Sequence, residues 1–389
     1  MDIQARIDEA LKRIVRLNAY LEQDPLNPHL LSEMIDLHVR VGDLGVARAV
    51  ADKAVAAYPD DVHFQCQLAN VMIEEGNLDQ AEAMLGSVLD HADRDPGIVY
   101  NLAFVHFVKR RFDEVLRLFA QHPDALERHT QARMLQANSL HHLGKTADAL
   151  DAVKKRLEAA PNDYAAMGMA GLLEFDLENP AQAERWARSA LAGEPDNLAA
   201  LVALGSVALF TDDFAQAQEL FEHAISVKSN DGRSWFGLAL ANMSASKLRE
   251  ALPAFNNAAE YLPAYANVRL SQGWCALLLG DISAAESSFR RALEIDRNFA
   301  ECHGSLAVSL VLQQRRQEAG HEIELALRLD STCLSARYAE ALASGEIKDI
   351  SDLTSFAARI FKKRDERDGV QDLSNIFLRR LATKSHTTH

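Results

Sequence analysis

Residues 232–265 read GRSWFGLALANMSASKLREALPAFNNAAEYLPAY, and this stretch of 34 residues is one copy of a unit that recurs along the chain. Its positions 8, 20 and 27 hold the small residues Ala239, Ala251 and Ala258, and its position 24 holds Phe255. Steps of 34 residues in both directions lead to the same residue types at the same positions. A fixed period of this length is typical of repeat arrays, so it has to be followed before any fold is inferred.

Nine frames of this length follow one another from residue 28 to residue 333 without an insertion or a deletion. Position 20 is alanine in eight of the nine frames, and position 8 is alanine or glycine in eight of the nine. These columns predict two short helices that pack closely, because a bulky residue at such a contact costs about 1–3 kcal/mol. The frames start at Pro28, Val62, Pro96, Thr130, Tyr164, Leu198, Gly232, Ala266 and Ala300.

The pattern of small residues at positions 8, 20 and 27, an aromatic residue at 24 and proline at 32 resembles the tetratricopeptide repeat (TPR). Trp235 supplies the tryptophan at position 4 of the frame quoted above. The resemblance implies an all-α fold, a right-handed α-α superhelical solenoid of nine repeats with terminal capping helices. The abundance of Ala, Asp and Glu is similar to that of bacterial members of the family.

Two frames depart from the pattern. In the third, Val115 replaces alanine at position 20, and Pro123 predicts a shortened second helix with an irregular joint after it. In the seventh, Pro253 falls inside the second helix. Because proline lacks a backbone N–H and clashes with the preceding turn, we expect it to kink or break that helix.

The chain divides into four predicted segments. Residues 1–27 form an N-terminal capping or association helix, because apolar residues recur there at helical spacing. Residues 28–333 hold the nine repeats, residues 334–384 form C-terminal helices with a basic amphipathic end, and residues 385–389 are disordered. Self-association through residues 1–22 or 370–382 is an alternative to simple capping. The apolar stripe of the C-terminal segment is Val370, Leu373, Ile376, Phe377 and Leu381.

The first helix of each repeat lines the concave face of the solenoid that the resemblance implies, with positions 2, 5, 9 and 12 turned toward it. From the third repeat onward these positions are mostly apolar or aromatic, which predicts a groove for a polypeptide segment. The predicted groove residues are Tyr100, Phe104, Phe107, Met134, Asn138, Leu172, Phe175, Arg233, Phe236, Leu240, Met243, Asn267, Leu270, Trp274 and Leu277. Packing between helices is the alternative interpretation for several of them.

One subclass of the family binds C-terminal carboxylates through basic residues in this groove. Here the corresponding positions of the first two repeats are His29, Ser32, Asp36, Cys66 and Asn70, so the basic residues are missing. We therefore expect no such role. The acidic first repeat instead favours a basic ligand.

Composition excludes several other functions. With 41 Lys and Arg against 56 Asp and Glu, the net charge is −15, which disfavours nucleic-acid binding. The four cysteines form no zinc-binding pattern and are interpreted as reduced thiols. No signal peptide and no apolar run long enough to span a membrane is found in the sequence, so a cytoplasmic protein is expected.

Catalytic motifs are also missing from the sequence. The stretch His321-Glu322-Ile323-Glu324 begins like a zinc protease motif but lacks the second histidine. The neighbours His141 and His142 point about 100° apart on a helix and do not share a metal. We therefore expect neither an enzyme nor a bound cofactor or metal.

The leading hypothesis is a scaffold or chaperone that binds an apolar or amphipathic polypeptide in its concave groove, by resemblance in a secretion or assembly system. A self-assembling structural scaffold and a peptide-sensing regulatory receptor are the alternatives. We expect polar substitutions of Phe104, Phe236 and Trp274 to abolish partner binding and to leave the array folded.

Overall fold

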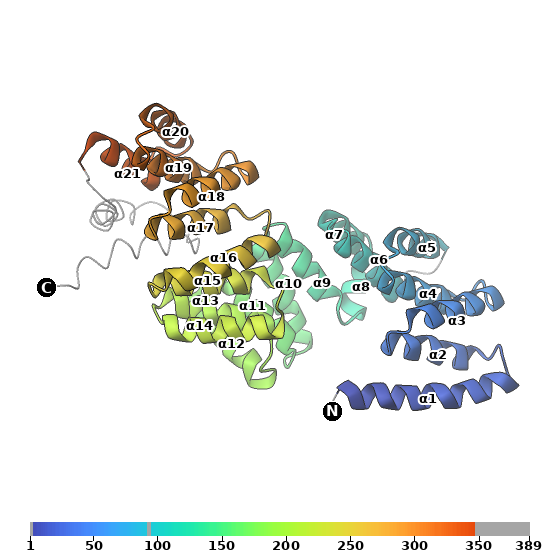
Figure 1. Ribbon diagram of the computed structural model, residues 1–389. Helices are drawn as coiled ribbons and strands as arrows, with labels where there is room; N and C mark the ends of the chain where they lie inside the picture. The colour runs from blue at the N-terminus through green and yellow to red at the C-terminus, as the bar shows by residue number, and fades with distance from the viewer. Residues whose placement is uncertain (1–2, 92–94, 347–389) are drawn as a thin grey trace. The chain divides into compact units, whose positions relative to one another are not determined.

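The computed structural model describes residues 3–91 and 95–346, and every regular element in these ranges is an α-helix. The predicted C-terminal stripe at residues 370–382 and the tail at 385–389 lie outside them. The described chain forms two compact units, unit 1 (Met1–Asn162) and unit 2 (from Asp163 on), each a stack of helix pairs (Figure 1).

Unit 1 holds ten helices within the described residues. They are α1 (Ile3–Gln23), α2 (Pro28–Arg40), α3 (Leu44–Ala57), α4 (Val62–Glu74), α5 (Leu78–His91), α6 (Pro96–Val108), α7 (Phe112–Gln121), α8 (Pro123–Arg128), α9 (Ala132–His142) and α10 (Thr146–Ala159).

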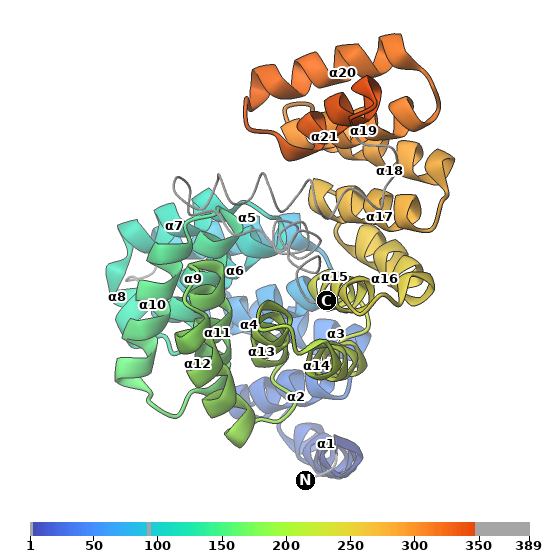
Figure 2. The same ribbon diagram turned by 90° about the vertical axis from the view of Figure 1, so that its left-hand side faces the viewer.

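Unit 2 holds eleven helices up to residue 346. They are α11 (Tyr164–Asp176), α12 (Pro180–Gly193), α13 (Leu198–Phe210), α14 (Phe214–Val227), α15 (Gly232–Ser244), α16 (Leu248–Tyr261), α17 (Ala266–Leu278), α18 (Ile282–Ile295), α19 (Ala300–Leu312), α20 (Arg316–Leu329) and α21 (Leu334–Ser344). Figure 2 shows α15, α17 and α19 following one another, each beside its second helix.

The helix starts follow the 34-residue register. Eight of the nine predicted frames open on the first residue of a helix, and the exception is α9, which starts at Ala132 instead of Thr130. Capping explains why the helices start so regularly, because the side chain before the helix accepts a hydrogen bond from an otherwise unpaired backbone N–H. Asn27, Asp95 and Asp231 each do so at the start of a first helix.

The small-residue columns mark the contacts between helices, as predicted. The alanines at position 20 are buried throughout, from Ala47 to Ala319. In α17, a Cβ added at Gly273 would lie 2.3 Å from the ring of Phe289 on α18, so no larger residue fits there without movement. The close packing of helices at these columns therefore depends on the small size of the residues there.

The turn between the two helices of each pair contains one residue with left-handed backbone geometry. It is always position 15 of the frame, with φ between 58° and 83°. Glycine adopts this geometry without steric cost, whereas other residues adopt it at a cost of about 1–2 kcal/mol. Four turns have glycine and five do not: Gly42, Gly76, Arg110, Gly144, Glu178, Asp212, Ser246, Gly280 and Gln314.

The two irregular frames behave differently from each other. In the third, α7 ends at Gln121 and the short helix α8 starts at Pro123, so the second helix is cut short as predicted. In the seventh, α16 continues without interruption through Pro253 from Leu248 to Tyr261. Of the predicted kink or break, the break is therefore wrong, because packing of the surrounding helix outweighs one missing hydrogen bond.

Helices also close the described ends of the array. On α1, Ala10, Ile14 and Leu17 pack against α2, while Leu11 and Val15 on the adjoining side are 48% and 70% exposed. At the other end, α21 packs against α19 and α20, and its Tyr338 is fully buried. The chain leaves α21 through Gly345, whose left-handed backbone ends the helix.

Candidate interaction surface

The candidate surface is the inner face, which we define as positions 2, 5, 9 and 12 of the first helix in each frame. In unit 1 the first helices are α2, α4, α6 and α9, and each packs beside the next. Their other sides pack against the second helices. The side chains of the inner face are therefore the ones that remain available to contact a ligand.

Three aromatic side chains of α6 form the centre of this face in unit 1. Tyr100, Phe104 and Phe107, hereafter the α6 aromatic row, are all half-buried. The rings of Tyr100 and Phe104 are stacked with centroids 6.3 Å apart. The row thus offers flat apolar surface at the spacing of one helix turn, as predicted.

The neighbouring helix α9 extends this surface. Met134, Asn138 and His141 are each half-buried on α9, and the hydroxyl of Tyr100 donates to Oε1 of Gln131 at 2.9 Å. Asn138 donates its amide to the carbonyl of Met134 at 2.9 Å, one turn earlier on the same helix. A thioether and a polar amide therefore border the aromatic row.

Two histidines and one phenylalanine that the sequence analysis did not place in the groove support the row. His129 stacks on Tyr100 with ring centroids 4.0 Å apart, and His142 stacks on Phe112 at 4.5 Å. Phe112 in turn meets Phe107 edge to face at 5.4 Å. These residues lie outside the four groove positions, so only their proximity in the folded unit identifies them.

Electrostatics keep this region uncharged near neutral pH. Burial lowers the pKa of His129 and that of His142, so the neutral imidazole is favoured at both. Burial raises the pKa of the Tyr100 phenol. The two imidazoles and the phenol beside the row are therefore uncharged near neutral pH.

The first two frames give unit 1 a polar margin. On α2, Asp36 is exposed and accepts a hydrogen bond from Nε2 of Gln67 at 2.9 Å. Ser32 lies 2.8 Å from Nε2 of His63 through its hydroxyl. Asn70 on α4 is exposed. An acidic and polar region thus adjoins the aromatic row.

The inner face of unit 2 differs from the prediction. Six predicted groove residues are almost completely buried and do not form an exposed surface: Phe236, Leu240, Met243, Leu270, Trp274 and Leu277. Leu172 and Phe175 on α11 are half-buried, as is Asn267 on α17. The expectation of an open apolar groove along this unit is therefore wrong.

For two of these residues the reason lies in contacts between helices. The ring of Phe236 meets Phe255 and Tyr265 with centroids 6.2 and 5.9 Å away. Trp274 meets Phe289 edge to face at 6.1 Å and donates Nε1–H to Ser305 on α19 at 3.0 Å. Both side chains pack as core residues, so we now expect their polar replacement to destabilise the unit as well as to affect binding.

An ion pair spans two frames on the same side of unit 2. Arg233 at the start of α15 reaches Asp176 at the end of α11, with two N–H to carboxylate distances of 2.9 and 3.3 Å. The two residues are 57 positions apart, so the pair passes over the intervening first helix α13. Arg233 is therefore engaged within its own unit.

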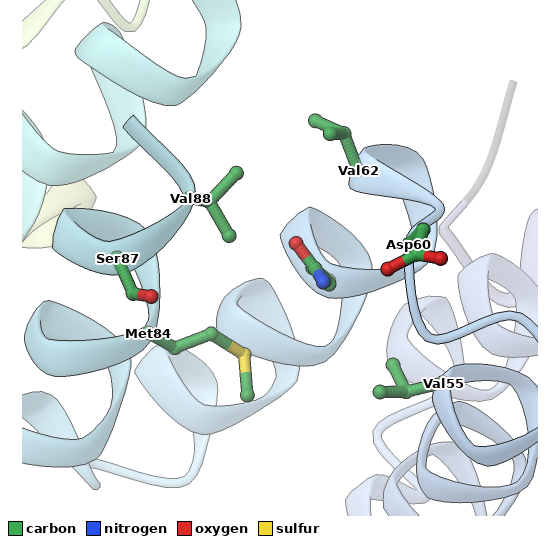
Figure 3. A pocket seen from close by; sticks show the side chains of 7 residues that line it. Val55, Asp60, Val62, Met84, Ser87 and Val88 are labelled. Carbon is green, nitrogen blue, oxygen red and sulfur yellow. The ribbon is translucent and has the colours of Figure 1, made fainter. Parts of the chain in front are cut away.

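A separate hollow lies on the second-helix side of unit 1 (Figure 3). It encloses about 640 Å³ between α3, the start of α4, and α5. Apolar side chains face it together with Asp60, Gln65 and Ser87. No acid, base and nucleophile converge there among the described side chains, so we assign it no chemistry.

Reactive groups are scarce in the part of the chain that the structure describes. No group of three or more His, Cys, Asp or Glu residues in these ranges could hold a metal. Burial raises the pKa of Cys66 and Cys275 to about 11 and also raises the pKa of Cys302 and Cys333, so the thiols are protonated and weakly nucleophilic. Within the same ranges, no helix combines the length and apolar character needed to cross a bilayer.

Comparison with protein families identifies the repeat. Family models described as "Tetratricopeptide repeat" match residues 32–83, 72–139, 198–231 and 239–299. Together these matches span slightly more than half of the chain. Among curated proteins, no sequence matches this chain significantly.

Among solved structures, one with the same helical fold matches nearly the whole chain and others match about half of it. The human IFIT1 dimer with m7Gppp-AAAA has a TM-score of 0.57 at 13% identity, covering 97% of this chain and 95% of IFIT1. PilF of Pseudomonas aeruginosa gives 0.48 at 16% identity, covering 56% and 98%. YrrB, described as a TPR protein with an unusual peptide-binding site, gives 0.40 at 20% identity, covering 49% and 98%.

Proposed function

Because this chain belongs to the tetratricopeptide repeat family, its helix pairs form a scaffold suited to protein interactions, and we propose that unit 1 binds an amphipathic polypeptide segment on its inner face. The α6 aromatic row carries the proposal. Three half-buried rings in succession keep apolar area in contact with water, and such patches commonly mark interaction sites. The proposal narrows the predicted groove to the residues on α6 and α9.

The side chains around the row indicate which kind of ligand would bind there. Aromatic rings and Met134 favour aliphatic or aromatic side chains, since both adapt to different apolar shapes. Unit 1 has 25 Asp and Glu against 18 Lys and Arg, and Asp36 is exposed on the adjoining helix. A segment with an apolar stripe and basic residues beside it therefore fits best.

The test uses the full chain and a displayed library of random 16-residue peptides, with a length chosen at about four helix turns. We expect selected peptides to combine apolar residues at helical spacing with Lys or Arg. Their affinity for Phe104→Asp should fall at least about tenfold, which corresponds to about 1.4 kcal/mol.

Val46→Asp is the matched control, because Val46 is an exposed apolar residue on the second helix α3. It adds the same charge to unit 1 away from the row, so binding should be unchanged. Equal affinity for Phe104→Asp and the control would place the peptide site elsewhere and refute the proposal.

A role in a secretion or assembly system and a chaperone role remain parts of this proposal that depend on the partner's identity. The self-assembling scaffold is the second candidate, and the exposed Leu11 and Val15 on α1 favour it. Light scattering of the full chain against Leu11→Asp/Val15→Asp separates the two. A monomer in both cases eliminates self-assembly through α1.

A further inference from the structure

Three first helices of unit 2, α13, α15 and α17, are covered on every side. In α15 the nine consecutive residues from Phe236 to Ser244 are all buried, and in α13 the ten from Ala200 to Leu209 are. In α17 the eight from Leu270 to Leu277 are buried as well. Since a helix completes a turn every 3.6 residues, these runs include every direction around each helix.

The described neighbours account for only part of this burial. Helix α15 packs against α13, α14, α16 and α17, which are its own second helix and the adjacent pairs. Contacts between α15 and α17 are no more extensive than those between α2 and α4 in unit 1, whereas α13 packs more extensively against α11 and α15. Packing within the stack therefore accounts for the cover of α13 better than for that of α15 and α17.

Unit 1 shows what the same packing leaves exposed. Position 9 of its first two frames is Asp36 and Asn70, both exposed, and in the next two it is Phe104 and Asn138, both half-buried. The corresponding positions of α13, α15, α17 and α19 are all buried: Ser206, Leu240, Trp274 and Val308. The register is identical. Contacts between helices bury Trp274, whereas the burial of Leu240 on α15 points to additional atoms over the inner face of unit 2.

The remaining chain has the composition for this position. Residues 347–389 follow α21, the last helix of unit 2, and lie outside the described residues. They contain the predicted apolar stripe from Val370 to Leu381. Residues 359–384 hold eight Lys and Arg against four Asp and Glu, whereas residues 163–346 hold 14 against 25. Apolar surface and opposite charge therefore complement each other.

We propose that the C-terminal segment, residues 359–384, binds the inner face of unit 2 with its apolar stripe against α13, α15 and α17. The chain then occupies one of its two inner faces itself and leaves the other, in unit 1, for a partner. This inference does not rest on the peptide site of unit 1. Its test concerns different residues and needs no external ligand.

Thiol labelling of the full chain tests the proposal. Met243→Cys places a thiol at position 12 of α15, where the native side chain is 3% exposed, in a Cys66→Ser background because Cys66 is half-exposed. With the native segment, maleimide labelling of position 243 should be slow. Adding Leu373→Asp/Phe377→Asp should raise the labelling rate at position 243 at least about tenfold. This factor corresponds to a loss of about 1.4 kcal/mol in the interaction between the C-terminal segment and unit 2.

Asn375→Asp/Ala382→Asp is the matched control, because these residues lie on the opposite side of the predicted helix from the stripe. It adds the same charge and should leave labelling slow. Buried Cys302 on α19 serves as an internal control for unfolding in every variant, with sites resolved by mass spectrometry. Slow labelling in both variants would show that unit 2 covers its own inner face by tight winding, and would overturn the proposal.

A second measurement covers the case in which the aspartate pair unfolds unit 2. A photoreactive benzoylphenylalanine replaces Phe377 in the otherwise native full chain and is irradiated at low protein concentration. Intramolecular crosslinks to α13, α15 or α17 are expected. Crosslinks only to other helices, only to a second molecule, or none at all would refute the proposal.

Discussion

Units 1 and 2 share one 34-residue register but present different inner faces. The α6 aromatic row of unit 1 is half-buried, whereas Phe236, Leu240 and Trp274 at the same frame positions of unit 2 are within 3% of complete burial. The register determines where helices begin and which residues share a side. It does not determine what covers that side, so equal positions have different roles in the two units.

Glycine contributes to the difference. First helices of unit 2 contain glycine at internal positions where a Cβ would collide with a neighbour, whereas those of unit 1 have only Gly97, at the start of α6. Without a Cβ, the backbones of adjacent helices can approach more closely. The internal glycines with the closest contacts are Gly168, Gly205, Gly237, Gly273 and Gly304.

The largest expected effect compares two aromatic truncations. Trp274→Ala should reduce the free energy of unfolding of unit 2 by about 3–5 kcal/mol, because it removes a buried ring and leaves a cavity. Phe104→Ala should cost unit 1 about 1 kcal/mol, since its ring is only half-buried. Urea unfolding followed by circular dichroism measures both. Similar losses would contradict the burial contrast.

A smaller effect with opposite signs is expected from two glycines. In Gly304→Ala on α19, the new Cβ would lie 2.4 Å from the backbone nitrogen of Ala336, so unit 2 should lose about 1–3 kcal/mol. In Gly86→Ala on α5, no atom lies within 4 Å, so unit 1 should gain about 0.5–1 kcal/mol of helix stability. The two shifts in urea midpoint should differ in sign. A gain in both would show that α19 and α21 do not constrain each other as described.

The smallest expected effect is a pH response that differs between the units. In unit 1, burial lowers the pKa of His129 and His142, so their stabilising contribution is present above the usual value of 6.5 and is lost as pH falls through it. In unit 2, the hydrogen bond that Nδ1 of His303 donates to the Glu322 carboxylate raises the pKa of His303. That contribution is present below 6.5 and is lost as pH rises through the folded-state pKa.

Tryptophan emission allows the two responses to be separated, because Trp186, Trp235 and Trp274 all belong to unit 2. As the pH is lowered from about 7.5 to about 5.5, the range in which histidine titrates, the thermal midpoint measured by tryptophan emission should rise relative to the midpoint measured by circular dichroism of the whole chain. His303→Gln should remove the part of this rise that originates in unit 2. A fall in emission midpoint that persists in His303→Gln would contradict the assignment.

The helix positions could be predicted from the sequence because capping and turn chemistry act locally. Asp95 and Asp231 each cap the helix that starts at the next residue, and this contact depends on the local sequence. The continuation of α16 through Pro253 could not be predicted. It depends on how the whole helix packs, and that packing cannot be read from the sequence. Frame positions likewise predicted that Phe104 is only half-buried, but they did not predict that the indole of Trp274 packs against Phe289 and Ser305.

The divided second helix of the third frame has a consequence for how the chain tolerates change. In a repeat array, cooperativity passes only between neighbouring helices. On the side of the preceding frame, α9 packs against two short helices, α7 and α8, instead of one long second helix. An inserted loop or domain beside the exposed Thr130 would thus disturb the fewest contacts, which makes this joint the natural place for the array to lengthen or acquire a new module.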